Sequence, residues 1–365
     1  MESFPLDRHQ YKLLHKVGKG KNSDVYIARC RTDRRQIAIK INHLDGAPHD
    51  VMNLRRGHSN WMVTRHPNLV NYFGSFNVGS DLWELCELID GGSVLNIIQY
   101  AFNHGFKDEV LLASILKPVL TFLAHFHKGH HIHRQIRTNG ILISRKGLVK
   151  VSDLCFSSAM IEFGQRKNAR FSVQGATCYT APEVISESGY KESSDIWSLG
   201  IIAIEMATGK APSSNLNDME KMKAILVGPP PVLPKSSGFS QTFIDFIQLC
   251  LRKNPEKRPS AAQLLDHKFF KNAQDSSYIH RVLMKQLPPI EEMFASLHGE
   301  EVKKIEKTLS AFLSCHNWDF DIESLLADEP CTQSMFVESP LAPIEPTVQI
   351  GRFKLTRQLT PTPMP

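Results

Sequence analysis

The sequence predicts an α+β fold with two lobes, a small β-rich N-terminal lobe and a larger helical lobe. Residues 10 to about 90 are mostly short β-rich runs such as DVYIARC and QIAIKI, with room for one helix between Asp50 and Arg65. From about residue 93 apolar residues recur every three to four positions, as in EVLLASILKPVLTFLAHFH, which is typical of buried helices. A chain of 365 residues is long enough for one such domain and a tail.

The chain divides into three predicted segments. Residues 1–10 form an N-terminal extension, residues 11–272 form the two-lobed domain, and residues 273–365 form a C-terminal tail. Within the tail, GEEVKKIEKTLSAFL predicts an amphipathic helix over residues 299–313. From about residue 328 the chain is rich in Pro, Thr, Glu and Ser. Such a composition buries too little apolar surface to fold alone, which predicts disorder.

Composition excludes several classes of protein. Hydrophobic residues make up 42% and charged residues 22%, as in ordinary globular proteins, and the net charge of +6 is spread without a basic stripe that would favour nucleic acid. Apolar runs fall short of the ~18 residues that a membrane-spanning helix needs. Seven cysteines without a C-x-x-C pair predict neither a disulfide framework nor a zinc site. The first residues lack a signal-peptide core, so we expect an intracellular protein.

A glycine-rich turn and a strand lysine mark the start of the sheet lobe. The run GKGKNSDV extends from Gly18 to Val25, and AIK ends at Lys40. In the pattern G-x-G-x-x-G-x-V, glycines let the backbone approach nucleotide phosphates, and a strand lysine reaches the α- and β-phosphates. Gly18 and Gly20 match, and Ser23 replaces the third glycine. A plain hairpin and a solvated strand-end lysine are the alternatives.

The stretch from His133 onward, HRQIRTNGILIS, follows a known catalytic pattern with two substitutions. In H-R-D-L-x-x-x-N the Asp takes the proton of the attacking hydroxyl and the Asn holds a magnesium ion. Those positions are Gln135 and Gly140 here. Asp153, at the end of VKVSD, stands where D-F-G places its metal-binding Asp and could hold one Mg²⁺. The alternative is a turn residue that caps a strand.

A third expected group is missing from the sheet lobe. The lysine of this pattern is normally held by a Glu from the single helix of the small lobe. Counting back from HPN, that Glu should lie near position 57, where the sequence has Gly57. The chain contains no Asp or Glu between Asp50 and Asp81, so a shift of one helical turn does not restore the pair.

Framework residues of the helical lobe are present. Glu183 lies in TAPE, Asp195 begins DIWSLG, and Arg258 lies in NPEKRPSA. We expect Arg258 to form a buried ion pair with Glu183. Because a buried pair that loses one partner costs ~3–5 kcal/mol, its presence indicates that the helical lobe must stay folded.

In this order, the motifs over residues 10 to about 270 resemble the protein-kinase family, and within it the STRAD pseudokinases of the sterile-twenty branch. HRQIRTNGILIS, FNVGSDLWEL, GQRKNARFSV and NPEKRPSA carry the second resemblance. The resemblance implies a bilobed protein-kinase-like fold that binds ATP. The nucleotide contacts that it implies are Gly18, Gly20, Val25, Ala38, Lys40, Cys86, Glu87, Leu88, Leu142 and Asp153.

The resemblance also implies a function. A STRAD-like chain is not an enzyme: it is a catalytically inactive adaptor that binds ATP, with at most one Mg²⁺, and allosterically activates and localises a partner Ser/Thr kinase of the tumour-suppressor type. The implied assembly includes a helical-repeat scaffold of the mouse-protein-25 type, in the cytoplasm and the nucleus. Trp318, Asp319 and Phe320 are similar to the Trp-Glu-Phe peptide that docks on that scaffold, although about 45 residues follow them here. A short apolar packing strip is the alternative.

Two other functions stay open. One is an atypical, weakly active Ser/Thr protein kinase, in which another group compensates for Gln135. The other is a scaffold that binds no nucleotide. Two features depart from the STRAD pattern: Asp153 is retained, and GPPPVLPKSSGFSQ is shorter than the insert expected there.

Overall fold

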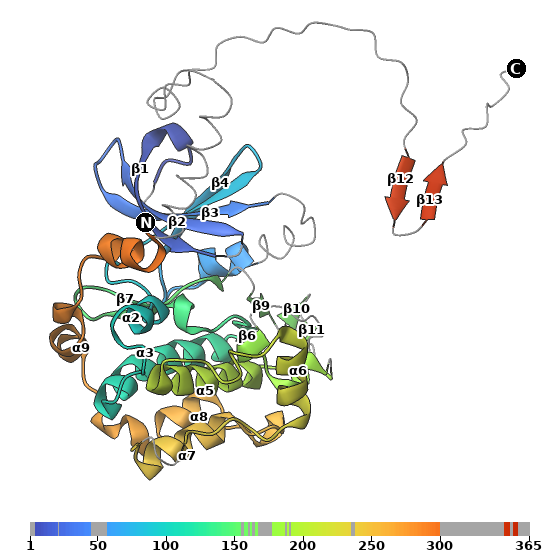
Figure 1. The fold of residues 1–365 in the computed structure, drawn as a ribbon. Coiled ribbons are helices and arrows are strands. Elements are labelled where there is room, and N and C mark those ends of the chain that lie inside the picture. The colour runs from blue at the N-terminus through green and yellow to red at the C-terminus, as the bar shows by residue number, and fades with distance from the viewer. Residues whose placement is uncertain are drawn as a thin grey trace, which may run out of the picture. The chain divides into compact units, whose positions relative to one another are not determined.

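In the computed structural model the chain forms two compact units, residues 1–305 and residues 306–365. The residues that the structure describes are 4–20, 22–44, 57–154, 157–159, 161–162, 165–166, 177–186, 188–189, 191–234, 238–299, 347–350 and 353–356. The first unit has a β-sheet lobe followed by a helical lobe (Figure 1), which confirms the predicted α+β, two-lobed fold.

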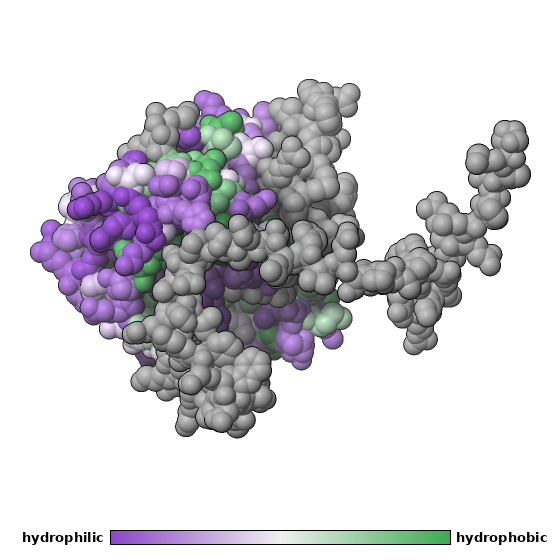
Figure 2. Space-filling view, turned by 90° about the horizontal axis from the view of Figure 1, so that it is seen from above, coloured by the Kyte–Doolittle hydropathy of each residue, from purple (hydrophilic) through white to green (hydrophobic). Residues whose placement is uncertain are grey.

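The small lobe is one antiparallel sheet of five strands in the order β1-β2-β3-β5-β4. The strands are β1 (Tyr11–Lys19), β2 (Ser23–Cys30), β3 (Gln36–His43), β4 (Tyr72–Val78) and β5 (Asp81–Cys86). A short 3-10 helix, η1 (Arg8–Gln10), precedes β1. In the view from above, hydrophilic side chains cover much of the coloured surface, with a smaller hydrophobic group among them (Figure 2).

Strand β3 shows how the sheet separates its two faces. Successive side chains of a strand point to opposite faces, so QIAIKI divides into two sets. Ile37, Ile39 and Ile41 belong to one apolar cluster, together with Phe4 and Trp83 and other residues of the outer face. The side chains between them, which include Lys40, therefore point to the opposite face, toward the helical lobe.

The described part of the predicted helix between Asp50 and Arg65 is helical over residues 57–63. It is attached to the sheet by aromatic packing, because His58 and Trp61 stack on Tyr72 with ring centroids 5.3 and 5.1 Å away. Trp61 also donates a hydrogen bond of 2.8 Å to the carbonyl of Val70. These contacts hold the helix against the face of the sheet that carries Lys40.

The large lobe is helical, with short two-stranded sheets at the side that faces the small lobe (Figure 1). Its α-helices are α2 (Val94–Ala101), α3 (Glu109–Lys128), α4 (Pro182–Ile185), α5 (Ser193–Thr208), α6 (Asp218–Val227), α7 (Gln241–Cys250), α8 (Ala261–Leu265) and α9 (Ser276–Val282). Its 3-10 helices are η2 (Thr138–Gly140), η4 (Thr177–Tyr179), η6 (Pro255–Lys257), η7 (Lys268–Asn272) and η8 (Met284–Gln286). The strand pairs are β6 (His131–Ile132) with β9 (Ser158–Ala159), β7 (Ile141–Ile143) with β8 (Val149–Val151), and β10 (Ile161–Glu162) with β11 (Gln165–Arg166).

Helix α3 is the centre of this lobe. Among the described residues it is the one helix long and apolar enough to cross a membrane, and 61% of its apolar window is buried inside the domain. It continues through Pro118, a residue that costs a helix interior ~3 kcal/mol. Its long row of buried side chains, from Leu111 to Phe126, offsets that cost through apolar burial.

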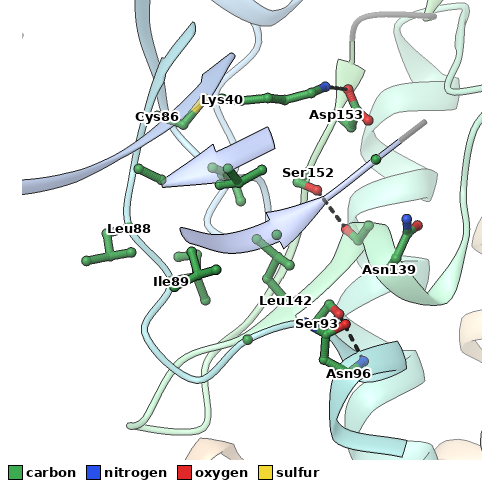
Figure 3. A pocket seen from close by; sticks show the side chains of 18 of the residues that line it. Lys40, Cys86, Leu88, Ile89, Ser93, Asn96, Asn139, Leu142, Ser152 and Asp153 are labelled. Atoms are coloured by element: carbon green, nitrogen blue, oxygen red, sulfur yellow. Dashed lines mark hydrogen bonds and ion pairs between the residues drawn. The ribbon is translucent and has the colours of Figure 1, made fainter. Parts of the chain in front are cut away.

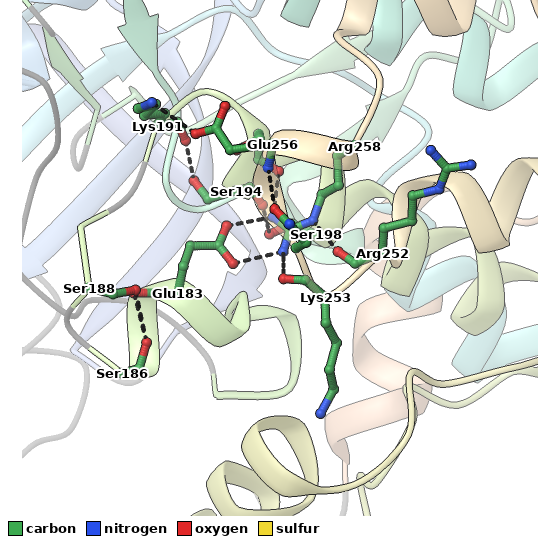
Figure 4. A network of polar contacts seen from close by, with 12 residues as sticks. Glu183, Ser186, Ser188, Lys191, Ser194, Ser198, Arg252, Lys253, Glu256 and Arg258 are labelled. Atoms are coloured by element: carbon green, nitrogen blue, oxygen red, sulfur yellow. Dashed lines mark hydrogen bonds and ion pairs between the residues drawn. The ribbon is translucent and has the colours of Figure 1, made fainter.

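The predicted pair of Arg258 and Glu183 is present and buried (Figure 4). Arg258 Nη2 lies 2.7 Å from Glu183 Oε2, and the second nitrogen of the same guanidinium contacts Oε1. Arg258 also donates to the carbonyls of Arg252, Lys253 and Ser193. This bidentate pair joins α4 to the loop between α7 and α8.

The packed domain extends past residue 272, where the sequence predicted its end. Helix α9, η8 and a further helix over residues 290–299 bury apolar side chains against the helical lobe and β7. Arg145, in the turn after β7, donates hydrogen bonds of 2.7 and 3.1 Å to the carbonyls of Leu287 and Pro288. The physical reason for the difference is that buried residues such as Leu283 and Met293 continue the core beyond the last recognisable motif.

The second unit has two described strands, β12 (Thr347–Ile350) and β13 (Phe353–Thr356), which pair antiparallel. The prediction of disorder from about residue 328 anticipated no strands here. The predicted helix over residues 299–313 lies outside the described residues, apart from its first residue. Residues 318–320, which include Trp318, also lie outside them.

Replacing Arg258 by Met should destabilise the protein by about 3–5 kcal/mol, because Glu183 is left charged and buried without its partner. Lys191→Met is the matched control. It breaks the ion pair with Glu256, in which both side chains are largely exposed, so it should cost no more than about 1 kcal/mol. Urea unfolding of the two variants measures the difference. Equal midpoints would contradict a buried structural role for Arg258.

Gly92→Ala should cost more stability than Gly79→Ala. Both glycines have positive φ, at +91° and +58°, so both variants carry backbone strain of about 1 kcal/mol or more. At Gly92 the new Cβ would lie 2.8 Å from Met293 Cε, whereas at Gly79 the structure has open space. Limited proteolysis should release residues 290–299 faster in Gly92→Ala alone. Equal proteolysis would mean that this helix does not depend on its contact with Gly92.

Candidate functional site

A pocket between the two lobes holds every residue that the sequence assigned to nucleotide binding (Figure 3). Its lining includes Gly18, Gly20, Val25, Ala38, Lys40, Cys86, Glu87, Leu88, Leu142 and Asp153. The strands β1, β2, β3 and β5 supply the upper wall, and β7 and the residue after β8 supply the lower wall. Residues more than a hundred positions apart therefore meet at one cavity.

The glycine-rich turn forms the edge of the pocket. It is the hairpin between β1 and β2, and its register shifts between Lys16 and Gly18. The amide of Gly20 donates a hydrogen bond of 2.6 Å to the carbonyl of Ser23. A Cβ at Gly20 would lie 2.5 Å from Ser23 Oγ and 3.3 Å from the Ser23 carbonyl oxygen, so a larger residue fits only if Ser23 moves. Glycine at the edge of the pocket lets a phosphate approach the backbone closely.

Lys40 and Asp153 form the ion pair at the inner end of the pocket. Lys40 Nζ donates a hydrogen bond of 2.8 Å to Asp153 Oδ1, across the gap between the lobes (Figure 3). Asp153 has a left-handed backbone, with φ of 72°, as it leaves the strand end. Arg137 Nη2 lies 3.8 Å from the other oxygen of Asp153. The carboxylate is thus placed between two cations and is only partly buried.

A carboxylate that the sequence analysis missed stands beside Lys40. Glu84 Oε2 lies 3.8 Å from Lys40 Nζ, and the Glu84 side chain is fully buried. Burial raises the pKa of this carboxyl, but the charge of Lys40 and the hydrogen bond with His58 outweigh burial and hold the pKa below its usual value. The expectation that the lysine has lost its carboxylate partner therefore holds for the helix at Gly57 but is wrong for the site as a whole. Alternation along DLWELC was the signal available in the sequence, because it places Glu84 on the inner face of β5.

The catalytic loop keeps its backbone geometry through Asp195. The buried Asp195 carboxylate accepts hydrogen bonds of 2.8 Å from the amides of both His133 and Arg134. His127 Nε2 lies 2.9 Å from the same carboxylate. Burial raises the pKa of Asp195, but the contact with His127 and the other hydrogen bonds outweigh it and lower the pKa below the ordinary value. A charged Asp195 therefore holds the loop from which Gln135 and Gly140 extend.

Two amide oxygens near the substituted positions have no partner. Within the described part of the chain, Gln135 Oε1 and Asn139 Oδ1 are buried and make no hydrogen bond. Asn139 lines the pocket and precedes Gly140 by one residue, a proximity that the motif comparison overlooked. A Cβ at Gly140 would meet nothing closer than Ser152 Oγ at 3.8 Å, so a Cβ fits at this position without a clash.

The C-terminal part of the domain also reaches the pocket. Ile290 is one of the lining residues, and it packs beside Gly92 at the end of the segment that joins the lobes. The sequence analysis assigned Ile290 to a tail and missed this contact. An isolated Ile beyond the last motif carries no signal of its own, since only the fold brings it to the cavity.

Comparison with known proteins identifies the domain. Residues 11–270 match the protein kinase domain family. The chain belongs to the protein kinase family. It is 33% identical over 312 residues to the serine/threonine-protein kinase fray2 of Dictyostelium discoideum, which covers 85% of this chain and 30% of that protein. It is 31% identical over 344 residues to germinal center kinase 3 of Caenorhabditis elegans, with coverage of 88% and 57%.

A third relative has nearly the same length. The serine/threonine-protein kinase ppk11 of Schizosaccharomyces pombe is 31% identical over 322 residues, which cover 86% of this chain and 98% of that protein. By contrast, this chain spans only about a third of fray2 and a little over half of germinal center kinase 3. These relatives are Ser/Thr kinases of the sterile-twenty, germinal-center-kinase-like type.

The comparison corrects the expectation that this protein kinase family member is not an enzyme. Relatives at 31–34% identity carry the name of a kinase, so the family assignment points to an enzyme. The earlier inference counted three missing groups, yet one of them, the carboxylate beside Lys40, is supplied by Glu84. Substituted motif positions alone do not establish that catalysis is absent.

Proposed function

We propose that this chain is an atypical Ser/Thr protein kinase that transfers the γ-phosphoryl group of ATP slowly. The observation that carries the proposal is the 2.8 Å pair of Lys40 and Asp153 at the inner end of a pocket edged by the glycine turn. A lysine that reaches phosphates and an aspartate that reaches a metal are the two charged groups that ATP needs from both lobes.

The lining of the pocket fits a nucleotide. Val25 and Ala38 from the upper wall and Leu142 from the lower wall give apolar surfaces suited to a flat base, and Lys40 gives a cation for the phosphates. Glu87 also lines the pocket, but its carboxylate is engaged in an ion pair with Lys150 at 2.7 Å. Apolar walls with a few polar groups at one end are typical of cofactor sites.

The site also fits one magnesium ion. Mg²⁺ in ATP-dependent enzymes is held by one or two carboxylates together with phosphate oxygens and water. Asp153 supplies one carboxylate, and the described residues contain no cluster of three His, Cys, Asp or Glu that would bind a metal without the nucleotide. When bound, Mg²⁺ would neutralise charge on the phosphates, which is the electrostatic part of the reaction.

Gln135 explains why transfer should be slow. Gln135 stands where the motif places the Asp that takes the proton of the attacking hydroxyl, and its amide oxygen is buried. An amide cannot remove the proton, and a positioned general base is worth about 10²–10⁴ in rate. Phosphoryl transfer depends chiefly on positioning and electrostatics, so loss of the base slows the reaction without abolishing it.

Gln135→Asp should raise the rate of phosphate transfer to a Ser/Thr peptide by up to about 10²–10⁴, because it restores a proton acceptor. Lys40→Ala should lower the rate of the wild-type protein about 100-fold or more, since a charged contact with the phosphates is lost. Transfer of radiolabelled phosphate measures both. The double variant is the control and should be slower than Gln135→Asp by about the factor that Lys40→Ala costs the wild type, because the two contributions are separate.

Two results would overturn the proposal. Transfer that survives Lys40→Ala would come from a contaminating kinase. Absence of a thermal shift with millimolar ATP and Mg²⁺ would mean that the pocket does not take the nucleotide, since a ligand that binds the folded state stabilises it.

Assembly with a tumour-suppressor-type kinase and a helical-repeat scaffold stays a prediction, supported by the resemblance of Trp318, Asp319 and Phe320 to a docking peptide. Removing an aromatic anchor from a docking peptide typically costs 2 kcal/mol or more of binding, roughly 30-fold in affinity. Affinity purification should therefore recover a helical-repeat protein with the wild type and lose it with Trp318→Ala. Equal recovery with both would assign these residues to another role.

A further inference from the structure

Sheet register places Glu84 directly beside Lys40. Strands β3 and β5 pair antiparallel, and Lys40 is the partner of Glu84 in that register. The alternation of each strand puts both side chains on the face toward the helical lobe, opposite the apolar cluster that contains Ile39 and Leu85. Directly opposed side chains of an antiparallel pair are close enough to interact.

Glu84 is held in place by groups on two elements. Asn42 Nδ2, from β3, donates a hydrogen bond of 2.8 Å to Glu84 Oε1. His58 Nε2, from the helix over residues 57–63, lies 2.8 Å from the same oxygen. A buried carboxylate is costly unless it is paired and hydrogen-bonded; both of these hydrogen bonds reach Oε1, and Lys40 supplies the charge beside Oε2 at 3.8 Å. The side chain is thus fixed before any nucleotide arrives.

The geometry also relates Glu84 to the missing helix carboxylate. Gly57 stands at the position expected for the helix Glu, and the next residue of that helix, His58, contacts Glu84. The helix therefore still acts on Lys40, but through an imidazole and a carboxylate that comes from the sheet. A movement of the helix over residues 57–63 would therefore be passed to Lys40 through the contact of His58 with Glu84.

Asp153 and Glu84 have different tasks in this arrangement. Lys40 is 2.8 Å from Asp153 and 3.8 Å from Glu84. A carboxylate that turns to a metal ion loses part of its hold on a neighbouring ammonium group, because both cations compete for the same oxygens. Glu84 is buried away from solvent, so we expect it to stay beside Lys40 when Asp153 is engaged.

We propose that Glu84 is the positioning residue for Lys40, in place of a carboxylate from the helix, and that it directs the ammonium group to the phosphates of ATP. His58 is the connection through which the helix acts on this pair. The inference rests on the proposed ATP-dependent function and assigns to it a residue from β5.

The test compares ATP with adenosine, which lacks the phosphates that Lys40 would contact. Glu84→Gln keeps the shape and removes the charge, so ATP affinity measured by calorimetry should fall about tenfold or more while adenosine affinity stays unchanged. Glu84→Asp, which keeps the charge, should retain part of the ATP affinity. In transfer assays the KM for ATP should rise in Glu84→Gln, and the KM for peptide should not.

A matched control and an exchange variant complete the test. Asp81→Asn removes another carboxylate of β5, one that pairs with His43 at the exposed end of the same two strands, and should leave ATP affinity unchanged. The combined change His58→Glu and Glu84→His returns the carboxylate to the helix and keeps the pair. It should recover ATP affinity relative to Glu84→Gln.

The outcomes separate this inference from the proposed function. Equal losses of ATP and adenosine affinity in Glu84→Gln would assign Glu84 a purely structural role, and unchanged ATP affinity would remove its role altogether. A wild type that binds ATP but transfers no phosphate would overturn the proposed kinase activity, while the ATP and adenosine comparison would still decide the role of Glu84. A wild type that binds no ATP would overturn both.

Discussion

The ion pair of Lys40 and Asp153 is the contact on which the site depends. One partner belongs to the sheet lobe and the other follows a strand of the helical lobe, so the pair forms only when the two lobes are closed on each other. Closure also brings the glycine turn over the cavity and places Leu142 opposite Val25. Glu84, on the neighbouring strand of the sheet, lies beside the same lysine. Lys40 thus has one partner within its own lobe and a second partner, Asp153, across the pocket.

The frame around the site is retained while part of its chemistry is changed. Asp195 holds the amides of His133 and Arg134, and the buried pair of Glu183 and Arg258 holds the lobe below. The changes at Gln135 and Gly140 affect proton removal and one metal ligand, and neither is needed for the fold. Under the proposed function, such a site would position its substrates but react slowly, because positioning and proton transfer are separate contributions to the rate.

Several parts of this arrangement could be derived from sequence because they depend on local pattern. The β-rich run QIAIKI indicated a strand, and apolar spacing indicated α3 despite Pro118. Glu84 was also within reach of reasoning from local pattern, since side chains along DLWELC alternate between the faces of the sheet. It was missed because the search for a carboxylate was confined to the helix, where motifs of the family usually place it.

The sequence by itself determined the two lobes, the glycine turn, Lys40, the substituted loop and the framework pair, because each depends on residue type at short spacing. Only the tertiary structure decided which carboxylate stands beside Lys40, since that depends on how β3 and β5 pair in register. It also decided that Ile290, far along the chain, lines the pocket. Strand register and long-range packing arise from the whole folded chain, and no local period records them.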